Sequence, residues 1–294
     1  MVAALDLGSF AAAHPRLTDR YLRRQEALGC IRPEWRLAWV DATGAIRARA
    51  VFWGLPGADR PLLLDVVLGD DDEATAVLLA AGLRDLALGA IDYQPTCALG
   101  VGRGADEPPA LEECGFALVA TQTRLLHSGP PPAVVGLSGV ELRAIAEVGY
   151  DALPSLVAEV RRATADRATS DRTDGDAEVA SLRQVAHDPH WWTLAIENGR
   201  PVGYVLPIRT DRGPVIGDIG VVLAARGRGI GRLLLAQGTT AVLGETGRVG
   251  ADVDVDNAAM LAVALSVGYA QVGARAHYVR PARRAALAKA IDEF

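Results

Sequence analysis

The sequence predicts an α+β fold arranged as two tandem domains, each a largely antiparallel, twisted sheet flanked by helices. The chain has 294 residues, which is long for one domain and comfortable for two. Short apolar strands joined by tight turns alternate with amphipathic helices, which is typical of mixed α/β domains. Two segments of the first half recur in the second half at nearly the same spacing, which indicates an internal duplication.

Composition excludes several classes of protein. Half of the residues are apolar and 22% are charged, as in a chain that buries a core. A net charge of −6 and a pI near 5.4 argue against a nucleic-acid partner. Apolar runs stay shorter than about 18 residues, and the N-terminus lacks a basic segment before an apolar stretch. Three widely spaced cysteines predict neither a disulfide framework nor a metal site. We expect a cytoplasmic monomer or homodimer with no membrane partner.

The first half contains a hairpin, a strand–helix unit and a final strand. Residues 37–53, LAWVDATGAIRARAVFW, are predicted as two strands around an Asp-Ala-Thr-Gly turn. Residues 61–86 are predicted as a strand followed by a helix, with Asp-Asp-Asp-Glu at 70–73 where the helix begins. Such carboxylates favour a helix N-terminus and would repel a phosphate, and a metal site is the less favoured alternative. Gly-Phe-Ala at 115–117 opens the final strand.

A proline-rich segment divides the chain. Residues 128–139 include three consecutive prolines, which stiffen a linker. We therefore expect a first domain over 1–127 and a second over 140–294.

The second half repeats the order of the first. The hairpin that starts at Leu194 matches the one at Leu37 with an offset of 157, and Gly-Tyr-Ala at 268–270 matches 115–117 with an offset of 153. The predicted elements are a strand turning into a helix over 140–160, a polar mobile segment over 164–177, a helix over 177–186, a hairpin over 191–207, a strand over 215–223, a helix over 229–243, a strand over 248–255, a helix over 258–265 and a strand over 270–279.

A glycine-rich turn separates the strand 215–223 from the helix 229–243. Its residues are Arg226, Gly227, Arg228, Gly229, Ile230 and Gly231. Glycines let successive backbone amides converge at a helix N-terminus, which suits a pyrophosphate. The spacing matches neither a dinucleotide-binding fingerprint nor a P-loop. A glycine-rich helix start without a ligand is the alternative interpretation.

The turn and the segment after it resemble the GCN5-related N-acetyltransferase (GNAT) superfamily. Arg226, Gly229 and Gly231 occupy the family's Arg/Gln-x-x-Gly-x-Gly/Ala positions, and DVDVDNAAMLAVALSVGY supplies the following strand, Asn257 and the final Gly-aromatic pair. The resemblance covers most of residues 140–280. The first domain, which has acidic residues in place of the glycines, is then a degenerate copy that does not bind coenzyme A.

The resemblance implies roles for specific residues. The backbone of Val221 and Val222 would pair with the pantetheine arm of acetyl-CoA or another acyl-CoA, and the Val222 amide would polarise the thioester carbonyl. The amides of residues 227–231 would hold the pyrophosphate. Asn257 would hydrogen-bond the pantetheine, although an Asn at a helix start is equally an N-cap. Where many members have a tyrosine that protonates the thiolate, this chain has Ala264.

Candidate acid–base residues lie on the strands around the turn. Asp218 is the first candidate base and Asp254 the second, since an amine must lose a proton before it attacks. Tyr278 could protonate the thiolate, although packing is the favoured interpretation. Tyr204, His187 and His190 are weaker candidates.

We therefore expect an acyl-CoA-dependent N-acyltransferase acting on a small-molecule amine. The alternative is a non-catalytic acyl-CoA-binding or scaffolding protein, supported by Ala264. Aminoacyl transfer from charged tRNA is disfavoured by the acidic pI.

Overall fold

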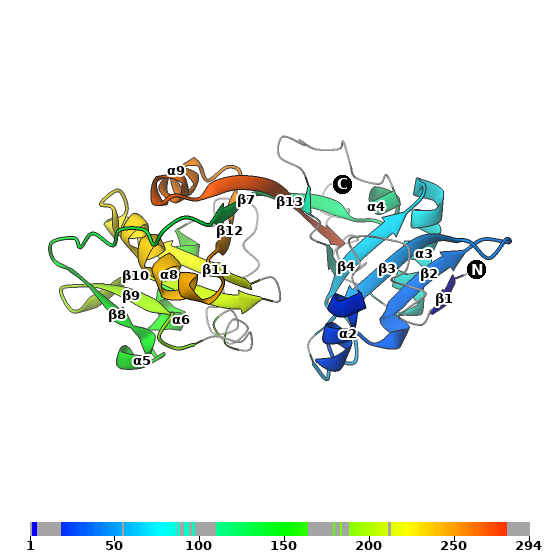
Figure 1. The fold of residues 1–294 in the computed structure, drawn as a ribbon, viewed down its shortest axis with the longest axis horizontal. Coiled ribbons are helices and arrows are strands. Elements are labelled where there is room, and N and C mark those ends of the chain that lie inside the picture. The colour runs from blue at the N-terminus through cyan, green and yellow to red at the C-terminus, as the bar shows by residue number, and fades with distance from the viewer. Residues whose placement is uncertain are drawn as a thin grey trace, which may run out of the picture. The chain divides into compact units, whose positions relative to one another are not determined.

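A computed structural model describes residues 2–4, 19–54, 56–86, 88, 91–93, 96–97, 110–163, 179, 183, 188–210 and 213–280. The chain divides into two compact units, residues 1–120 with 275–294 (unit 1) and residues 121–274 (unit 2) (Figure 1). Both units are mixed α+β with a mostly antiparallel sheet, which confirms the fold class predicted from the sequence.

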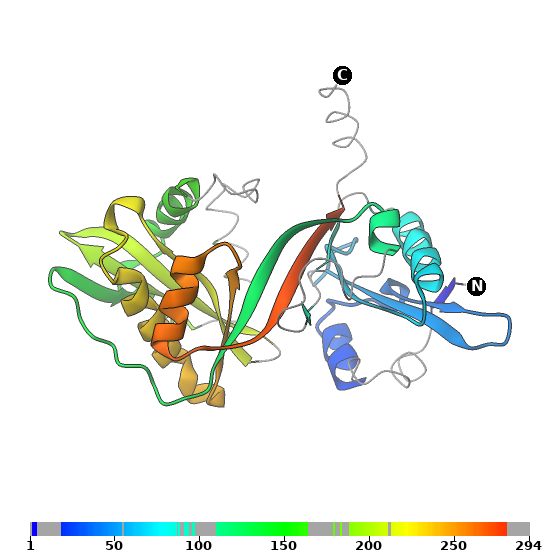
Figure 2. The ribbon, with the colours of Figure 1, turned by 90° about the horizontal axis from the view of Figure 1, so that it is seen from above.

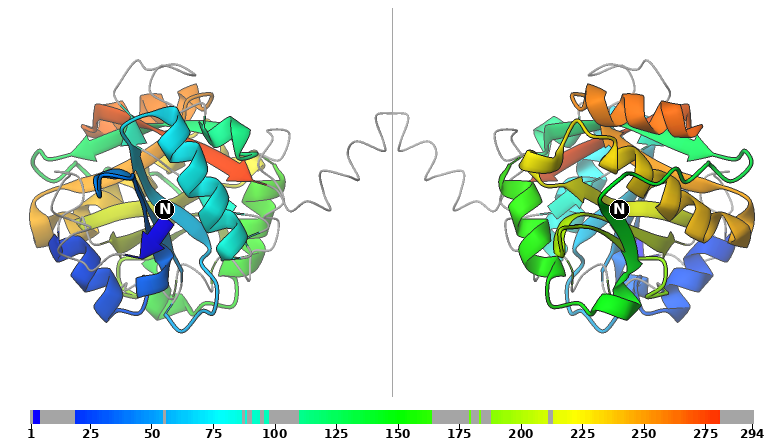
Figure 3. Two further views of the ribbon diagram at one scale, coloured as in Figure 1. Left: turned by 90° about the vertical axis from the view of Figure 1, so that its right-hand side faces the viewer. Right: turned by 90° about the vertical axis from the view of Figure 1, so that its left-hand side faces the viewer.

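Unit 1 is a sheet with helices on both faces. Its strands are ordered β1-β2-β3-β4-β5-β13, with β4 and β5 paired in parallel. Helix α3 packs against the face that carries Phe52, and the shorter helix α2 places Leu22 against Val51 on the other face (Figures 2 and 3). The element bounds are β1 Val2–Ala4, α2 Asp19–Ala27, β2 Arg36–Val40, β3 Ile46–Trp53, β4 Leu63–Gly69, α3 Asp72–Asp85, β5 Ile91–Tyr93, β6 Thr96–Cys97, α4 Ala110–Glu113 and β7 Ala117–His127, whose last residues belong to unit 2.

Unit 2 contains the glycine-rich turn. Its strands are ordered β13-β7-β12-β11-β10-β9-β8 (Figure 1), and β11 pairs with β12 in parallel. The predicted helix over 177–186 and polar segment over 164–177 lie almost wholly outside the described residues. The element bounds are β8 Val140–Ala144, α5 Ile145–Val148, α6 Leu153–Arg162, β9 Thr193–Glu197, β10 Arg200–Thr210, β11 Gly213–Val221, η2 Leu223–Ala225, α8 Ile230–Thr246, β12 Val249–Asp254, α9 Ala258–Val267 and β13 Ala270–Arg280, whose last residues belong to unit 1.

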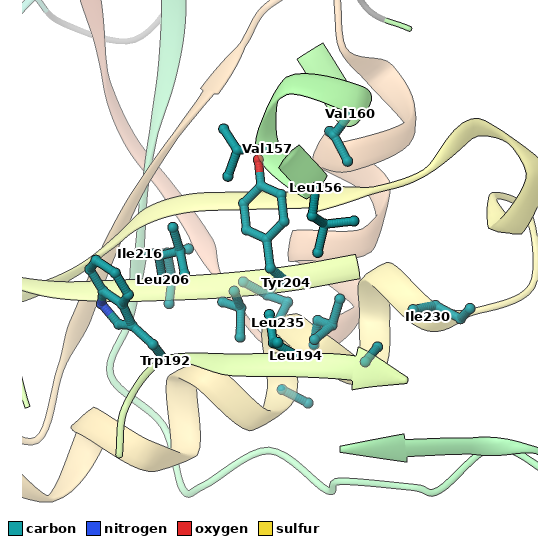
Figure 4. Packing of buried hydrophobic residues seen from close by; sticks show 14 of the residues in the cluster. Leu156, Val157, Val160, Trp192, Leu194, Tyr204, Leu206, Ile216, Ile230 and Leu235 are labelled. Carbon is teal, nitrogen blue, oxygen red and sulfur yellow. The ribbon is translucent and has the colours of Figure 1, made fainter. Parts of the chain in front are cut away.

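Helices α8 and α6 cover opposite faces of the unit 2 sheet, and glycines bring both close to it. A Cβ at Gly238 of α8 would lie 2.6 Å from Val205 Cγ2. On the other face, a Cβ at Gly220 of β11 would lie 2.6 Å from Val160 Cγ1 of α6. Tyr204 is buried between the sheet and α6, with its ring pointing toward the helix (Figure 4). Side chains larger than hydrogen at these glycines would push the helices off the sheet.

The two units share the same pair of β-bulges. One bulge falls in the second strand of the hairpin, at Arg47 in unit 1 and Val202 in unit 2. The other falls in the next strand, at Asp65 and Gly217. The surrounding pairs are Trp39↔Ala48, Val40↔Ile46, Val51↔Val66 and Phe52↔Leu64 in unit 1, and Ala195↔Gly203, Ile196↔Pro201, Leu206↔Asp218 and Pro207↔Ile216 in unit 2. Equivalent bulges in equivalent strands support the internal duplication.

The register also corrects the predicted alignment of the two hairpins. Trp39 corresponds to Ala195, an offset one residue shorter than the 157 predicted from the sequence. In a strand a one-residue slip exchanges the two faces. The predicted alignment therefore matched residues that point to opposite sides of their sheets.

Each unit takes its last strand from the other half of the sequence. In unit 2, residues 122–127 of β7 pair antiparallel with β12. In unit 1, residues 278–280 of β13 pair antiparallel with β5. The units therefore do not follow the predicted division into 1–127 and 140–294, because the terminal strands of the two halves are exchanged.

Candidate functional site

The glycine-rich turn links β11 to α8 and leaves the start of the helix open. Gly227 and Gly229 adopt the left-handed conformation, with φ of 75° and 85°. Gly229 is the N-cap of α8 and supplies no side-chain cap. Among the described residues, a Cβ at Gly227 would meet nothing within 4 Å, and one at Gly231 would lie 3.8 Å from Val221 Cγ2. Uncapped amides beside open space form a site that suits an anion.

Two arginines of the turn are held by neighbouring groups. The Arg226 Nε donates a hydrogen bond to the Val221 carbonyl at 2.9 Å, which braces the turn against the end of β11. Arg228 forms a two-pronged ion pair with Glu197, the last residue of β9, with Nη1 2.9 Å from Oε2. Hydrogen bonding by Arg228 lowers the pKa of Glu197, and Glu197 in turn raises that of Arg228. Leu137 lies beside the turn, 3.8 Å from a Cβ placed on Gly229.

Strands β11 and β12 separate from one another toward the turn. Along these two fully described strands, the parallel ladder has the single pair Val215↔Gly250. The Val222 amide donates to the Val202 carbonyl at 3.0 Å. The sheet therefore already holds this amide, contrary to the polarising role expected for it. Along an antiparallel pair, successive residues point their backbone N–H and C=O alternately toward the partner strand and away from it. Because Val222 bonds to β10, the N–H and C=O of Val221 point away from β10, toward the side where β12 diverges.

Asn257 is the N-cap of α9, where its side-chain oxygen accepts a hydrogen bond from the Met260 amide at 3.1 Å. The capping interpretation is thus observed directly. Asp254, at the end of β12, accepts from the Asp256 amide at 3.0 Å. Ala264 is buried in α9.

Asp218 lies at the centre of a polar cluster between β11 and α6. Its Oδ2 accepts hydrogen bonds from Arg161 Nη2 at 3.0 Å and from the Tyr204 hydroxyl at 3.1 Å. Its Oδ1 accepts from the Ile219 amide at 2.9 Å. The Asp218 side chain keeps 19% of its surface exposed, so the carboxylate remains accessible. Sequence reasoning missed Arg161, because nothing in its local pattern links the end of α6 to a strand 57 residues later.

The other candidate residues lie apart from this cluster. Tyr278 is buried in the core of unit 1 and stacks on Tyr93 with a centroid distance of 6.2 Å. Among the described residues its hydroxyl has no hydrogen-bond partner. His190 is exposed in a turn after Asp188, which accepts from its amide at 2.8 Å. His187 lies outside the described residues.

In unit 1 the described connection from β4 to α3 differs from the glycine-rich turn. Two residues join β4 to α3, against eight between β11 and α8. Asp71 caps α3 by accepting from the Ala74 amide at 2.7 Å, and its Oδ2 lies 3.0 Å from Arg47 Nη2. The Ala74 hydrogen bond and then the Arg47 one lower the pKa of Asp71. The Asp71 carboxylate thus takes the place that an anion would occupy at the start of α3.

A separate hollow of about 610 Å³ opens at the edge of unit 2. It lies between β8, α5 and the turn that joins β9 to β10, and includes neither Asp218 nor the turn glycines. The lining residues are Gly139, Val140, Glu141, Arg143, Val148, Ala152, Ile196, Asn198, Gly199 and Pro201.

Two features are absent from the part of the chain that the structure describes. No group of three or more His, Cys, Asp or Glu side chains there could hold a metal ion. None of the helices there is both long enough and apolar enough to cross a membrane.

Comparison with known proteins identifies the fold. Residues 157–269 match the Acetyltransferase (GNAT) family. A search of curated protein sequences found no significant match. A GCN5-related N-acetyltransferase from Sphaerobacter thermophilus superposes with a TM-score of 0.65 at 19% identity, covering 96% of each chain.

Two further solved structures share the fold. A tandem GNAT protein from the clavulanic acid biosynthesis pathway gives a TM-score of 0.52 at 18% identity, covering 83% of this chain and 82% of its own. A GCN5-related N-acetyltransferase from Kribbella flavida gives 0.53 at 16%, covering 80% and 87%. The glycine-rich turn and the diverging strands lie within the segment that matches the Acetyltransferase (GNAT) family, residues 157–269, and these solved structures share the fold of the chain.

Proposed function

We propose that this protein transfers an acyl group, acetyl in the first instance, from coenzyme A to the amine of a small molecule. The observation that carries the proposal is the open, glycine-lined start of α8 beside the point where β11 and β12 diverge. The GCN5-related N-acetyltransferases that share this fold support it. A non-catalytic acyl-CoA-binding protein is the second candidate, because Ala264 stands where many relatives have an acid.

The coenzyme is expected to bind through backbone groups. The amides of residues 227–231 would hold its pyrophosphate, with the helix dipole favouring the negative charge. Val221 would pair with the pantetheine arm, and its amide takes the polarising role first assigned to Val222, since Val222 donates to Val202. A donor aimed at the thioester oxygen stabilises the charge that develops there.

Asp218 is the proposed base, and Asp254 is the second choice. At pH 7 only about one molecule in a thousand of an amine with a pKa near 10 is neutral. A base that removes the ammonium proton therefore speeds the reaction. The neutral amine attacks the thioester carbon, and the C–S bond breaks to release a thiolate. Because a thiol has a pKa near 8.5, its thiolate can leave without a dedicated acid. The reaction therefore does not need an acid at the position of Ala264, and Tyr278 is not assigned the role of acid.

A substitution inside the turn tests coenzyme binding. Replacing Gly229 would confound the test, since its positive φ strains any larger residue. Gly231 has no such constraint, and a Cβ there meets only Val221 Cγ2 at 3.8 Å. We expect Gly231→Trp to abolish binding of coenzyme A in a calorimetric titration with the melting temperature unchanged.

Gly244→Trp is the matched control, because it lies on the same helix and a Cβ there has nothing within 4 Å. It should bind like the wild type. Wild-type affinity in Gly231→Trp would reject the site.

Turnover separates the two candidate functions. The wild type, with acetyl-CoA and a panel of small amines, should release free thiol in proportion to acylated amine. Tight coenzyme binding without thiol release across the panel would favour the non-catalytic protein.

A further inference from the structure

We propose that Tyr204 and Arg161 are positioning residues that fix the Asp218 carboxylate so that its Oδ1 receives the proton of the acceptor amine. This inference rests on the proposed acyltransferase function and deepens it. It assigns different tasks to the two oxygens of one carboxylate. It also explains why Tyr204 and Arg161, which have no part in coenzyme binding, both contact Asp218.

The hydrogen bonds around Asp218 are distributed unequally. Oδ2 accepts from both side chains, Arg161 at 3.0 Å and Tyr204 at 3.1 Å. Oδ1 accepts from the Ile219 backbone at 2.9 Å. A carboxylate oxygen has two lone-pair sites, so Oδ2 is filled and Oδ1 retains one site. The retained site on Oδ1 is where an incoming ammonium group can donate.

The backbone is shaped to bring these groups together. Gly217 is the bulged residue directly before Asp218, and a bulge redirects the side chain beside it. Gly220 leaves room for the Tyr204 ring, whose Cζ would lie 2.9 Å from a Cβ at that position. Arg161 is the penultimate residue of α6, which the same glycine lets approach the sheet.

Unit 1 provides an internal comparison. It has the same bulge in the equivalent strand, but the positions that correspond to Asp218, Gly220 and Tyr204 are occupied by Val66, Leu68 and Arg49. The unit without the glycine-rich turn therefore also lacks the polar cluster. A cluster needed only to stabilise this fold would have no reason to occur with the turn, whereas one that serves the acyl transfer would.

The chemical step is balanced without further reactants. The ammonium proton moves to Asp218 Oδ1, and the electron pair of that N–H bond becomes the nitrogen lone pair. This pair forms the new N–C bond, and the pair of the C–S bond leaves on sulfur. The nitrogen then loses its surplus proton to the departing thiolate, so that the products are a neutral amide and a free thiol. Tyr204 and Arg161 keep their own protons and hold Oδ2, which fixes the direction of Oδ1.

Tyr204→Phe is the decisive variant, because it removes one hydroxyl and keeps the buried ring. We expect kcat to fall at least tenfold, with KM for acetyl-CoA within twofold of the wild type. A change confined to folding would instead lower the melting temperature and the fraction of the protein that binds acetyl-CoA.

Tyr269→Phe is the matched control. Tyr269 is buried in the same core, its hydroxyl lies 2.7 Å from Thr239 Oγ1, and burial raises its pKa to about 12. Loss of this hydroxyl should leave kcat unchanged. Equal effects of the two variants on kcat would overturn the proposal.

Arg161 provides an independent test by conservative rescue. Arg161→Met should lower kcat as Tyr204→Phe does, and Arg161→Lys should recover part of it, because an ammonium still donates to Oδ2. Arg162→Met, at the exposed neighbouring position, should behave like the wild type. A wild-type protein that binds no coenzyme A refutes the proposed function itself. An active wild type with unchanged Tyr204→Phe and Arg161→Met variants refutes the positioning role alone.

Discussion

Arg228 of the glycine-rich turn donates to both carboxylate oxygens of Glu197, with Nη1 2.9 Å from Oε2. The pair ties the turn to the end of β9 and places a carboxylate beside the proposed phosphate site. Both side chains are partly exposed, so solvent and salt screen the pair, and a ligand phosphate can compete for the guanidinium.

Glu197→Gln should tighten binding of coenzyme A. The change removes a negative charge near the site and releases Arg228 for the ligand. We expect an affinity gain of about threefold at low salt that shrinks as ionic strength rises. Isothermal titration at two salt concentrations measures it.

Glu245→Gln serves as the control for that variant. Glu245 forms a similar ion pair with Arg209, but at the C-terminal end of α8. The affinity of the Glu245→Gln variant for coenzyme A should equal that of the wild type. A loss of affinity in Glu197→Gln would mean that the pair orients Arg228 toward the ligand rather than competing with it.

Asp218→Asn should slow turnover at least tenfold with little change in coenzyme affinity. Asparagine keeps the shape of the side chain but cannot accept the amine proton. Steady-state kinetics with saturating acetyl-CoA gives kcat, and Asp254→Asn is the comparison. Wild-type rates in Asp218→Asn together with a slow Asp254→Asn would transfer the base role to Asp254.

We expect the buried His127 to make the protein less stable in mild acid. Burial lowers its pKa, and among the described residues its Nδ1 has no hydrogen-bond partner. Because the folded pKa is below the unfolded value, the unfolded chain binds more protons once the pH falls below about 6.5. The free energy of unfolding should therefore decrease below that pH, as urea titrations at several pH values would measure.

His127→Phe should lack this part of the pH dependence, since phenylalanine keeps a ring against Tyr269 without titrating. His190→Gln, at an exposed position, should retain it. Identical slopes for wild type and His127→Phe would contradict the prediction.

Cutting the chain between its halves should not separate them. A protease site inserted within residues 128–139 yields two fragments, the first carrying β7 and the second carrying β12 and β13. Since residues 122–127 pair with β12 and residues 278–280 pair with β5, the fragments should elute together in size-exclusion chromatography. Separate elution under native conditions would contradict the strand exchange.

Local sequence signals predicted most of the elements near the turn. The helix predicted over 229–243 extends over Ile230–Thr246, and that over 258–265 over Ala258–Val267. Asp71 caps α3, as carboxylates at a helix start predict. These features depend on short-range periodicity and capping, which neighbouring residues determine.

Features that depend on long-range pairing were not predictable from the sequence. The exchange of β7 and β13 depends on which distant edge each strand meets, and nothing in their own residues specifies it. The strand register makes Ala195 the counterpart of Trp39, one residue away from the alignment that the letters suggest, and a comparison of letters does not contain the register. Arg161 reaches Asp218 only because Gly220 lets α6 lie close to the sheet.

The exchanged strands bear on why a repeat without a phosphate-binding turn persists in the gene. After a duplication, a copy that has no function of its own can normally be lost by deletion. Here, removing it would also remove residues 122–127 and leave β12 with an unpaired edge, which invites aggregation. The first repeat, whose helix start is acidic and capped by its own Asp71, is therefore tied to the second by the strand that it supplies to β12.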